Sequence, residues 1–465
     1  MKNFDVAIIG AGPAGLFAAH HILKDSDHAT ILLIDKGKAA QERKCCGNCQ
    51  ICRDKERCSI LCGVGGGGLF SDGKLVLDLH SGGKLDTITN LSEQKQEKLV
   101  TTIVETLKEH DGQSELSPNI SADEQERWQH LCSAEGLEIK HYDVLHMGTE
   151  NLHHITMGFA ATICENSRVS LNLNCEIVRL ENGSHNESIL YSANGEVFYA
   201  ENVIFSVGKT GSNWLRGLFA EKRIALKKES TYIGIRLEVP HSTIEELFEY
   251  SFDPKIWTYY GERKVKTHCF CRHGDIVCTN YMGFPIVGGH TRFTAYNDVP
   301  FDNQSLRGNF NILVSTKHAE EDIYQVLEQF RQINPSGVVV QKLSDFLCLE
   351  NSESLENATI MAHMTQCKTG NIRKILDAFD TVGTLIADFI MHLSKIVPGI
   401  LDNSSLVYAP ALEWFMDSVE VNSNMETVHK GWFAVGDGAG LSQGIVHSAA
   451  TSIIAAEEIC RRMKK

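Results

Sequence analysis

The stretch Asp5-Val-Ala-Ile-Ile-Gly-Ala-Gly-Pro-Ala-Gly15 decides the fold. Its apolar first half predicts a buried parallel strand over residues 5–9. Pro13 suits the first turn of a helix, which we expect to continue to residue 23. Residues 30–35, Thr-Ile-Leu-Leu-Ile-Asp, then predict a second buried strand. Together these segments predict a β-α-β unit of about thirty residues.

Gly10, Gly12 and Gly15 have the spacing of the Rossmann fingerprint for dinucleotides. The first glycine allows a tight turn, the second lets the backbone approach a pyrophosphate, and the third allows close packing of helix on strand. Asp35 ends the second strand, where an acidic residue accepts hydrogen bonds from a ribose diol. The alternative is a tight turn that binds nothing, but the matching strands, helix and acid favour a dinucleotide site.

A second glycine-rich turn, Gly436-Asp-Gly438, follows a strand predicted over residues 432–435 and precedes a helix predicted over residues 445–463. The alternative here is an ordinary turn between strand and helix. Two such turns at opposite ends of one chain resemble the two-part FAD enzymes related to glutathione reductase. This resemblance implies that the late turn lies against the ribityl chain and pyrophosphate of FAD. It also implies that the following helix points at the flavin, where its N-terminus would favour the anionic reduced ring.

Longer motifs resemble a narrower group, the bacterial family of uncharacterised FAD-dependent dehydrogenases. The run Gly65-Gly-Gly-Gly-Leu-Phe-Ser-Asp-Gly-Lys-Leu75 is similar to the GGAGxFSDGKL motif of that family. Further similar segments, in the right order, are residues 146–150, 233–238, 267–271, 273–277 and 436–440. The chain departs from the family in residues 411–415, which lack an arginine, and at Asp437, where many members carry glutamate. The resemblance implies an FAD-dependent oxidoreductase, a dehydrogenase or reductase that transfers a hydride between a small-molecule substrate and flavin N5.

By resemblance to the wider class, the strand that ends at residue 208 passes near the cofactor, and residues 175–178 contact the adenine through their backbone. No second GxGxxG with a downstream acid occurs, so no separate NAD(P)H domain is expected. The predicted FAD-binding residues are Gly10, Gly12, Pro13, Ala14, Gly15, Asp35, Lys36, Ile177, Val207, Gly208, Gly436, Asp437, Gly438 and Gly444.

The chain is therefore expected to have an α/β fold, with a Rossmann-like FAD-binding domain of three layers around a parallel sheet. Residues 1–215 and 428–465 are predicted to form this domain, including a Cys-rich loop at 45–62. Residues 216–427 are predicted to form an inserted mixed α/β substrate domain. Its antiparallel strands are expected over residues 232–238, 266–271 and 275–278, and its helices over 318–333 and 371–396. Two further helices are expected over residues 92–112 and 121–135.

Six of the 15 cysteines fall within residues 45–62. In a large chain without a secretory signal, such a cluster favours metal or redox chemistry over a disulfide framework. Tightly spaced thiolates suit tetrahedral zinc or an iron–sulfur cluster, and the spacing does not distinguish the two. The alternatives are a redox pair beside the flavin and a set of free thiols. The predicted ligands are Cys46, Cys49, Cys52 and Cys58, with Cys62 as the alternate.

Lys74, His290 and His447 are the candidate catalytic residues. Lys74 would hold the N1/C2 side of the flavin or an acidic substrate, unless it is a solvated lysine in a turn. His290 would line the pocket beside two glycines, and His447 would approach the flavin from the last helix. The alternative for each histidine is a side chain that is simply hydrogen-bonded.

Two pairs of residues share a strand face because each pair is two residues apart. Arg236 and Glu238 either anchor a substrate carboxylate or form a structural ion pair. Cys269 and Cys271 are interpreted as core or pocket lining, with redox function as the alternative.

The chain of 465 residues carries 44 Lys+Arg and 59 Asp+Glu, for a net charge of −15. This acidic balance counts against nucleic acid or anionic lipid as the main partner. No signal segment and no apolar run of about 20 residues is evident, so we expect a soluble, cytoplasmic protein. The expected partners are a small-molecule substrate and an electron-transfer partner. The alternative functions are an FAD monooxygenase and a flavoprotein with a structural or RNA-modifying role.

Overall fold

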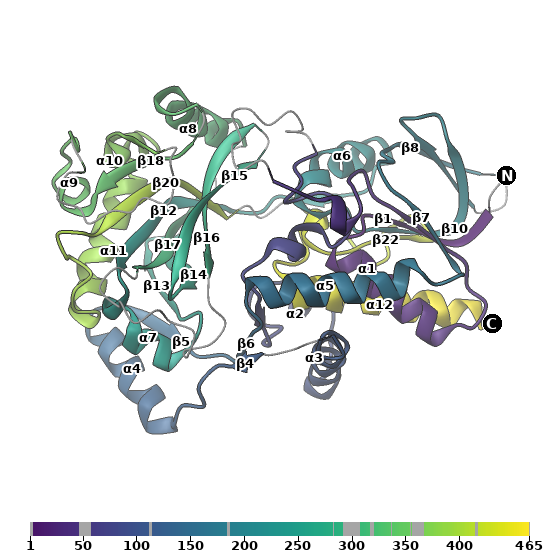
Figure 1. Ribbon diagram of the computed structural model, residues 1–465, viewed down its shortest axis with the longest axis horizontal. Helices are drawn as coiled ribbons and strands as arrows, with labels where there is room; N and C mark the ends of the chain where they lie inside the picture. The colour runs from purple at the N-terminus through teal and green to yellow at the C-terminus, as the bar shows by residue number, and fades with distance from the viewer. Residues whose placement is uncertain are drawn as a thin grey trace.

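The computed structural model describes residues 3–45, 57–110, 114–183, 187–281, 283–291, 307–316, 320–335, 337–353, 355, 367–413 and 417–464. The molecule has two lobes, each built around its own sheet, and both chain termini lie on the same lobe (Figure 1). Among the described residues, no helix combines the length and apolar character needed to cross a lipid bilayer.

The first sheet has the strand order β7-β2-β1-β10-β9-β8, and β22 also pairs with β10. Its strands are β1 (Asn3–Ile9), β2 (Ile31–Ile34), β7 (Val169–Asn172), β8 (Ile177–Asn182), β9 (Ser188–Ser192), β10 (Val197–Phe205) and β22 (Trp432–Ala434). The expected strands at residues 5–9, 30–35 and 432–435 are confirmed. The sheet is mixed and not purely parallel, because β8, β9 and β10 pair antiparallel. The links between these three strands are too short for the crossover that parallel neighbours need.

The last part of the chain completes this first lobe. β22 pairs in parallel with β10, with Val203 opposite Trp432 and Phe205 opposite Ala434. Helix α12 (Ile445–Met463) follows and packs on α1 (Pro13–Asp25). Helix α5 (Thr149–Cys164) packs on the same helix, with the rings of Phe17 and Phe159 4.8 Å apart. The predicted helix over residues 445–463 is confirmed.

The second sheet has the strand order β19-β18-β20-β12-β17-β14-β13-β5. Its strands are β5 (Glu138–Lys140), β12 (Thr231–Pro240), β13 (Lys255–Tyr260), β14 (Arg263–Cys271), β17 (Arg307–Thr316), β18 (Val339–Lys342), β19 (Lys368–Thr369) and β20 (Leu406–Glu413). The expected antiparallel pairing is present, since β12 pairs with β17 and β17 with β14 in that sense. Beside this sheet lies a separate hairpin of β15 (Gly274–Tyr281) and β16 (Phe284–Thr291). The segment expected as a strand at 275–278 lies in this hairpin.

Part of the second lobe comes from the first third of the chain. β5 pairs with β13, and Trp128 of α4 (Ala122–Ala134) belongs to the same hydrophobic core as Ile256 and Phe248. The domain boundaries at residues 215 and 428 stay a prediction, but α4 and β5 precede residue 215 and pack with the second sheet.

The predicted helices appear with small changes at their ends. α3 (Glu93–Lys108) and α4 begin after Ser92 and Ser121, whose hydroxyls accept hydrogen bonds from backbone amides three residues later. The segment 371–396 is not continuous, because Asp380 and Thr381 have φ angles of 54° and 55°, which interrupt an α-helix. It divides into α10 (Ile372–Asp377) and α11 (Val382–Ile396). The remaining elements are α2 (Leu85–Ile88), α6 (Gly208–Glu221), α7 (Glu245–Tyr250), α8 (Glu320–Ile333), α9 (Leu343–Cys348), β3 (Lys74–Val76), β4 (Glu115–Leu116), β6 (Val144–His146), β11 (Leu226–Lys227) and β21 (Ser418–Val419).

Candidate functional site

A cavity of about 410 Å³ lies in the first lobe, where β1, β2, β10 and β22 end. Its volume falls in the range of small-molecule and cofactor sites, and the carboxyl edge of a parallel sheet is where such sites occur. The lining residues are Ile9, Gly10, Gly12, Pro13, Ala14, Ile34, Asp35, Lys36, Leu61, Cys62, Gly66, Gly67, Gly68, Ser71, Cys175, Glu176, Ile177, Ser206, Val207, Gly208, Lys209, Thr210, Gly211, Trp214, Gly436, Asp437, Gly444, Ile445 and Ser448.

Three helices direct their N-termini at this cavity. The first turns of α1, α6 and α12 all contribute lining residues. A helix N-terminus carries unpaired amide groups and partial positive charge, so it favours a negatively charged ligand. Lys36 and Lys209 add two ammonium groups to the same lining. The cavity is therefore suited to a ligand with anionic groups such as a pyrophosphate.

The three glycines of the first turn have different surroundings. A Cβ atom on Gly10 would lie 2.2 Å from the carbonyl oxygen of Ser206, and one on Gly15 would lie 1.9 Å from the carbonyl oxygen of Gly10. Both positions therefore require glycine for close backbone packing. A Cβ on Gly12 would have Gly66 Cα, 3.6 Å away, as its nearest atom, so this position is open toward the cavity. That openness fits the expected approach of a ligand to the backbone.

Asp35 is held in place by the backbone at the end of β2. One carboxylate oxygen accepts a hydrogen bond of 2.9 Å from the amide of Ala11, and the other accepts one of 2.8 Å from the amide of Gly37. Each oxygen keeps acceptor capacity for a second partner. Because Asp35 also lines the cavity, its carboxylate fits the role of accepting hydrogen bonds from a diol.

The late glycine-rich turn meets the first lobe's other turns through its backbone. A Cβ on Gly438 would lie 2.4 Å from the carbonyl oxygen of Gly208, so these two chain segments touch. The Asp437 carboxylate accepts hydrogen bonds from the hydroxyls of Ser442 and Ser448, at 2.8 and 2.9 Å. Of the predicted FAD-binding residues, all line the cavity except Gly15 and Gly438, which pack against neighbouring backbone.

Several lining residues were not predicted from the sequence. Lys209, Thr210, Gly211 and Trp214 belong to α6, which starts directly after β10. The signal for them was a glycine that follows an apolar strand and opens a helical segment, the same arrangement as at the start of the chain.

The glycine run after the Cys-rich segment lies against the start of α1. A Cβ on Gly66 would lie 2.8 Å from Gly12 Cα. The buried Arg43 fixes this run, since its guanidinium donates hydrogen bonds to the backbone carbonyls of Ser59, Ile60, Val64 and Gly66. One arginine thus holds the segment that closes one side of the cavity.

Of the predicted metal ligands, Cys46, Cys49 and Cys52 lie outside the described residues. Cys58 and the alternate ligand Cys62 are described. Cys62 is buried, lines the cavity, and has its sulfur 3.4 Å from the hydroxyl of Thr210. Burial raises the pKa of its thiol. The metal site itself stays a prediction.

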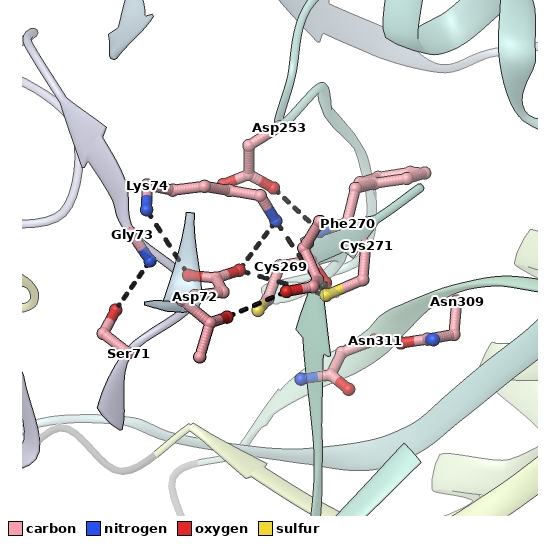
Figure 2. A network of polar contacts seen from close by, with 12 residues as sticks. Ser71, Asp72, Gly73, Lys74, Asp253, Cys269, Phe270, Cys271, Asn309 and Asn311 are labelled. Atoms are coloured by element: carbon pink, nitrogen blue, oxygen red, sulfur yellow. Dashed lines mark hydrogen bonds and ion pairs between the residues drawn. The ribbon is translucent and has the colours of Figure 1, made fainter. Parts of the chain in front are cut away.

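A second group of polar side chains begins one residue beyond the cavity-lining Ser71. It consists of Asp72, Lys74, Cys269 and Cys271, which Figure 2 labels, and of Arg236, and we call it the buried network. The Lys74 ammonium lies 2.9 Å from the Asp72 carboxylate, and their side chains are only 7% and 12% exposed. The alternative of a solvated lysine is therefore wrong.

The charges of this pair reinforce each other. Burial alone would raise the pKa of Asp72, but the Lys74 ammonium, acting together with His146 and His290, outweighs burial and holds that pKa well below its usual range. Burial would likewise lower the pKa of Lys74, but the Asp72 carboxylate, acting together with Cys271, Cys269 and Asp253, outweighs burial and raises that pKa. Both groups are therefore ionised across the physiological pH range.

Arg236 is fully buried in β12 and bonded to fixed polar groups. Its guanidinium donates to the side-chain oxygens of Asn309 and Asn311, at 2.6 and 3.0 Å, and to the carbonyl oxygen of Cys269 at 2.9 Å. Glu238, two residues along, accepts a hydrogen bond of 2.7 Å from the hydroxyl of Tyr408. Arg236 and Glu238, which were predicted to act together, thus each form these hydrogen bonds with different groups.

The two candidate histidines lie in different places. His290 on β16 is half-buried, and burial is the main cause that lowers its pKa, with Asp72 raising it and Arg236 lowering it. His290 and Lys74 therefore both lie close enough to Asp72 to lower the pKa of its carboxylate. His447 is buried in α12 against the loop at Gly83, where a Cβ would lie 2.4 Å from its ring. It is not among the residues that line the cavity.

Comparison with known proteins finds no matching family model and no similar curated protein. Membership of the family resembled in sequence therefore stays a prediction. Solved structures similar to the chain include glycine oxidase from Geobacillus kaustophilus, with a TM-score of 0.40, 13% identity, and coverage of 99% of this chain and 95% of that chain. A flavoprotein/dehydrogenase from Cytophaga hutchinsonii has a TM-score of 0.41 and 11% identity, covering 100% and 79%. The FrdA chain of E. coli quinol fumarate reductase has a TM-score of 0.42 and 12% identity, covering 100% and 71%. These similarities are distant and assign no function to this chain.

Proposed function

We propose that the protein is an FAD-dependent oxidoreductase that transfers a hydride between a small-molecule substrate and flavin N5. The observation that supports this best is the convergence of three helix N-termini on one cavity that also contains Asp35. A dinucleotide needs both features, because its pyrophosphate is anionic and its adenosine ribose offers a diol.

The residues present fit the parts of FAD. The amides at the start of α1 and the open face of Gly12 would hold the pyrophosphate, and Asp35 the adenosine ribose. Ile177 would contact the adenine. The turn at Asp437 and the N-terminus of α12 would lie along the ribityl chain and the ring.

A bound flavin would supply a two-electron acceptor and donor, while the chain positions the substrate and handles protons. The candidate catalytic residues are Lys74, His290 and His447. The pairing with Asp72 keeps Lys74 protonated, so it can attract an anionic substrate. The lowered pKa of His290 keeps its imidazole neutral at neutral pH, so it can accept a proton.

The proposal also includes an electron-transfer partner and a zinc or iron–sulfur centre. That centre would be held by Cys46, Cys49, Cys52 and Cys58. Its support is the close spacing of these four cysteines in the sequence.

The test is reconstitution of the purified chain with FAD. Bound oxidised flavin should absorb near roughly 370 and 450 nm. Asp35→Asn should weaken FAD binding by at least about tenfold, or ~1.4 kcal/mol, because it removes the charge that accepts from the ribose. The exposed Asp27→Asn is the matched control, and thermal unfolding shows whether each variant is folded. A chain that stays colourless with excess FAD, or that binds NAD more tightly, would overturn the proposal.

A further inference from the structure

Cys269 and Cys271 are brought together by an irregularity in β14. The pairing of β14 with β17 shifts register between His268 and Cys271. At this point Cys269 has a φ angle of 55°, in the left-handed region that a residue with a side chain rarely adopts. In a regular strand, residues two apart are separated by about 6.6 Å along the chain. Here the two sulfurs and a carboxylate oxygen of Asp72 all lie within 4.8 Å of one another.

The surrounding structure keeps the strand in this conformation. Arg236 donates a hydrogen bond of 2.9 Å to the carbonyl oxygen of Cys269. The Asp253 carboxylate accepts one of 3.1 Å from the amide of Phe270 (Figure 2). The Phe270 ring stacks on that of Phe310, with centroids 4.3 Å apart. A strained backbone that is held from several sides is characteristic of functional sites.

The charges around the two sulfurs favour one thiolate. Arg236 approaches the Cys271 sulfur to 3.2 Å and Lys74 approaches it to 4.0 Å. A hydrogen bond from Cys271 is the main cause that lowers the pKa of Cys269 to about 6, and the two cations lower it further. The same hydrogen bond, followed by burial, raises the pKa of Cys271. Near neutral pH the pair therefore shares one proton, the state from which a thiolate can react.

The same charges disfavour a metal ion at these residues. The Asp72 carboxylate is paired with Lys74 at 2.9 Å, and the Cys271 sulfur already accepts from a guanidinium. A divalent cation would have to sit beside two fixed positive charges in a buried site, which is costly.

The pair lies next to the cavity along the chain. Ser71 lines the cavity, and the next residue is Asp72, whose carboxylate lies 3.9 Å from the Cys271 sulfur. We propose that Cys269 and Cys271 form a redox-active dithiol–disulfide pair that exchanges two electrons with flavin bound in the cavity. This inference rests on the proposed function, because the flavin is its electron acceptor.

From the state in which the pair shares one proton, the remaining S–H bond breaks, one S–S bond forms, and one proton and two electrons leave. The flavin takes up both electrons together with that proton and becomes the anionic reduced ring. The oxidised isoalloxazine of FAD, or in the reverse direction the reduced one, is the chemical class that takes up or supplies the two electrons. The chain thereby gains a second store for a pair of electrons beside the flavin.

The first experiment reads the thiols directly. Trypsin should release residues 267–272, Thr-His-Cys-Phe-Cys-Arg, as one peptide that contains both cysteines and no other. The folded protein is oxidised or reduced with the flavin present, quenched in acid, alkylated under denaturing conditions and analysed by mass spectrometry. We expect a peptide lacking two hydrogens and unlabelled after oxidation, and a doubly alkylated peptide after reduction.

The second experiment counts electrons. Anaerobic titration of the oxidised FAD-bound protein with dithionite should consume four electrons per flavin, two for the flavin and two for the disulfide. Cys269→Ser and Cys271→Ser should each consume two, with unchanged FAD content. Cys348→Ser, at an exposed cysteine on α9, is the matched control and should still consume four.

The outcomes separate the inference from the function on which it rests. Bound FAD with two electrons consumed and both cysteines always alkylated would overturn the inference alone. The inference would also be overturned if the folded protein contained one zinc ion per chain and lost it only in Cys269→Ser or Cys271→Ser. A disulfide in a chain that binds no FAD would overturn the proposed function and, with it, the electron acceptor. The peptide assay uses the unmodified chain, so a variant that fails to fold does not blunt the test.

Discussion

The cavity and the buried network are built from opposite materials. The cavity is lined largely by glycines and helix N-termini, whose backbone amides supply many of its polar groups beside the side chains of Asp35, Lys36 and Lys209. The buried network is made of ionised and sulfur-containing side chains held between the two lobes, from Asp72 and Lys74 on one side to Arg236 and Cys271 on the other. A backbone site depends on space and is insensitive to pH, whereas a network of charges depends on every partner being present.

The largest expected effect is on the buried network, through Asp72→Asn. The change leaves the Lys74 ammonium buried without its counter-charge, so the free energy of unfolding should fall by about 3–5 kcal/mol. Denaturant unfolding near pH 7 measures it. Asp72→Asn combined with Lys74→Met should recover most of the loss, because no uncompensated charge remains. A single-variant loss below about 1 kcal/mol would show that the pair behaves like a surface ion pair.

The second effect is the pH dependence that the network confers through His146. Burial, followed by the charge of Lys74, lowers the pKa of this side chain to about 4, and the residue is only 6% exposed. The unfolded chain takes up a proton near pH 6.5 and the folded chain does not until about pH 4. This contribution is therefore fully present above about pH 6.5 and is lost as pH falls toward 4, by about 3 kcal/mol in total.

The check on this slope is His146→Gln, which cannot titrate. The free energy of unfolding of the natural chain should fall more steeply between pH 6.5 and 4.5 than that of the variant. Parallel slopes would mean that His146 is solvated in the folded protein, contrary to the burial shown here.

A smaller effect, confined to the cavity, is expected for Gly12→Ala. The backbone at Gly12, with φ −77° and ψ −173°, accepts a side chain, and the nearest atom to a new Cβ is 3.6 Å away. Stability should therefore stay within about 0.5 kcal/mol. The added methyl enters the space of the pyrophosphate, so FAD should bind at least about tenfold more weakly, or ~1.4 kcal/mol. If the natural chain and Gly12→Ala bind FAD equally tightly in a fluorescence titration, Gly12 does not lie against the ligand.

The smallest effect is the control for both regions, Gly217→Ala. This glycine is exposed in the interior of α6, and a Cβ there would have no atom within 4 Å. Alanine should raise the free energy of unfolding by about 0.5–1 kcal/mol through helix preference alone. FAD affinity should not change. A change in FAD affinity would show that the stability of α6 is coupled to binding in the cavity at its N-terminus.

The cavity could be predicted from the sequence to a large extent. Gly10, Gly12, Gly15 and Asp35 lie in one continuous β-α-β unit, where spacing alone specifies geometry. The contribution of α6 was missed although Gly208 marks its start. α5 was missed as well, because its threonines, histidines and Gly158 have weak helix preference, and its packing through Phe159 on α1 is a tertiary effect.

Most members of the buried network could be singled out from the sequence, since Lys74, Arg236, Cys269 and Cys271 are all candidate residues there. Their assembly could not be predicted, because they come from segments near residues 72, 236 and 270 that are far apart in the chain. The approach of Cys269 to Cys271 depends on a local register shift that strand periodicity does not reveal. Only the assembled sheet of the second lobe, next to Ser71 of the first, brings these charges together.

The position of β22 in the chain has a consequence for synthesis. Until residues 432–434 leave the ribosome, the edge of β10 at Val203–Phe205 has no partner, and α1 lacks α12, most of whose residues are buried. An uncovered apolar strand edge is a template for aggregation. The first lobe therefore begins with β1 and closes only with α12, while the strands of the second lobe are complete earlier. While residues 1–431 are being synthesised, the cavity stays open on the side that β22 and the start of α12 later close, and this is the stage at which the nascent first lobe most needs chaperone protection.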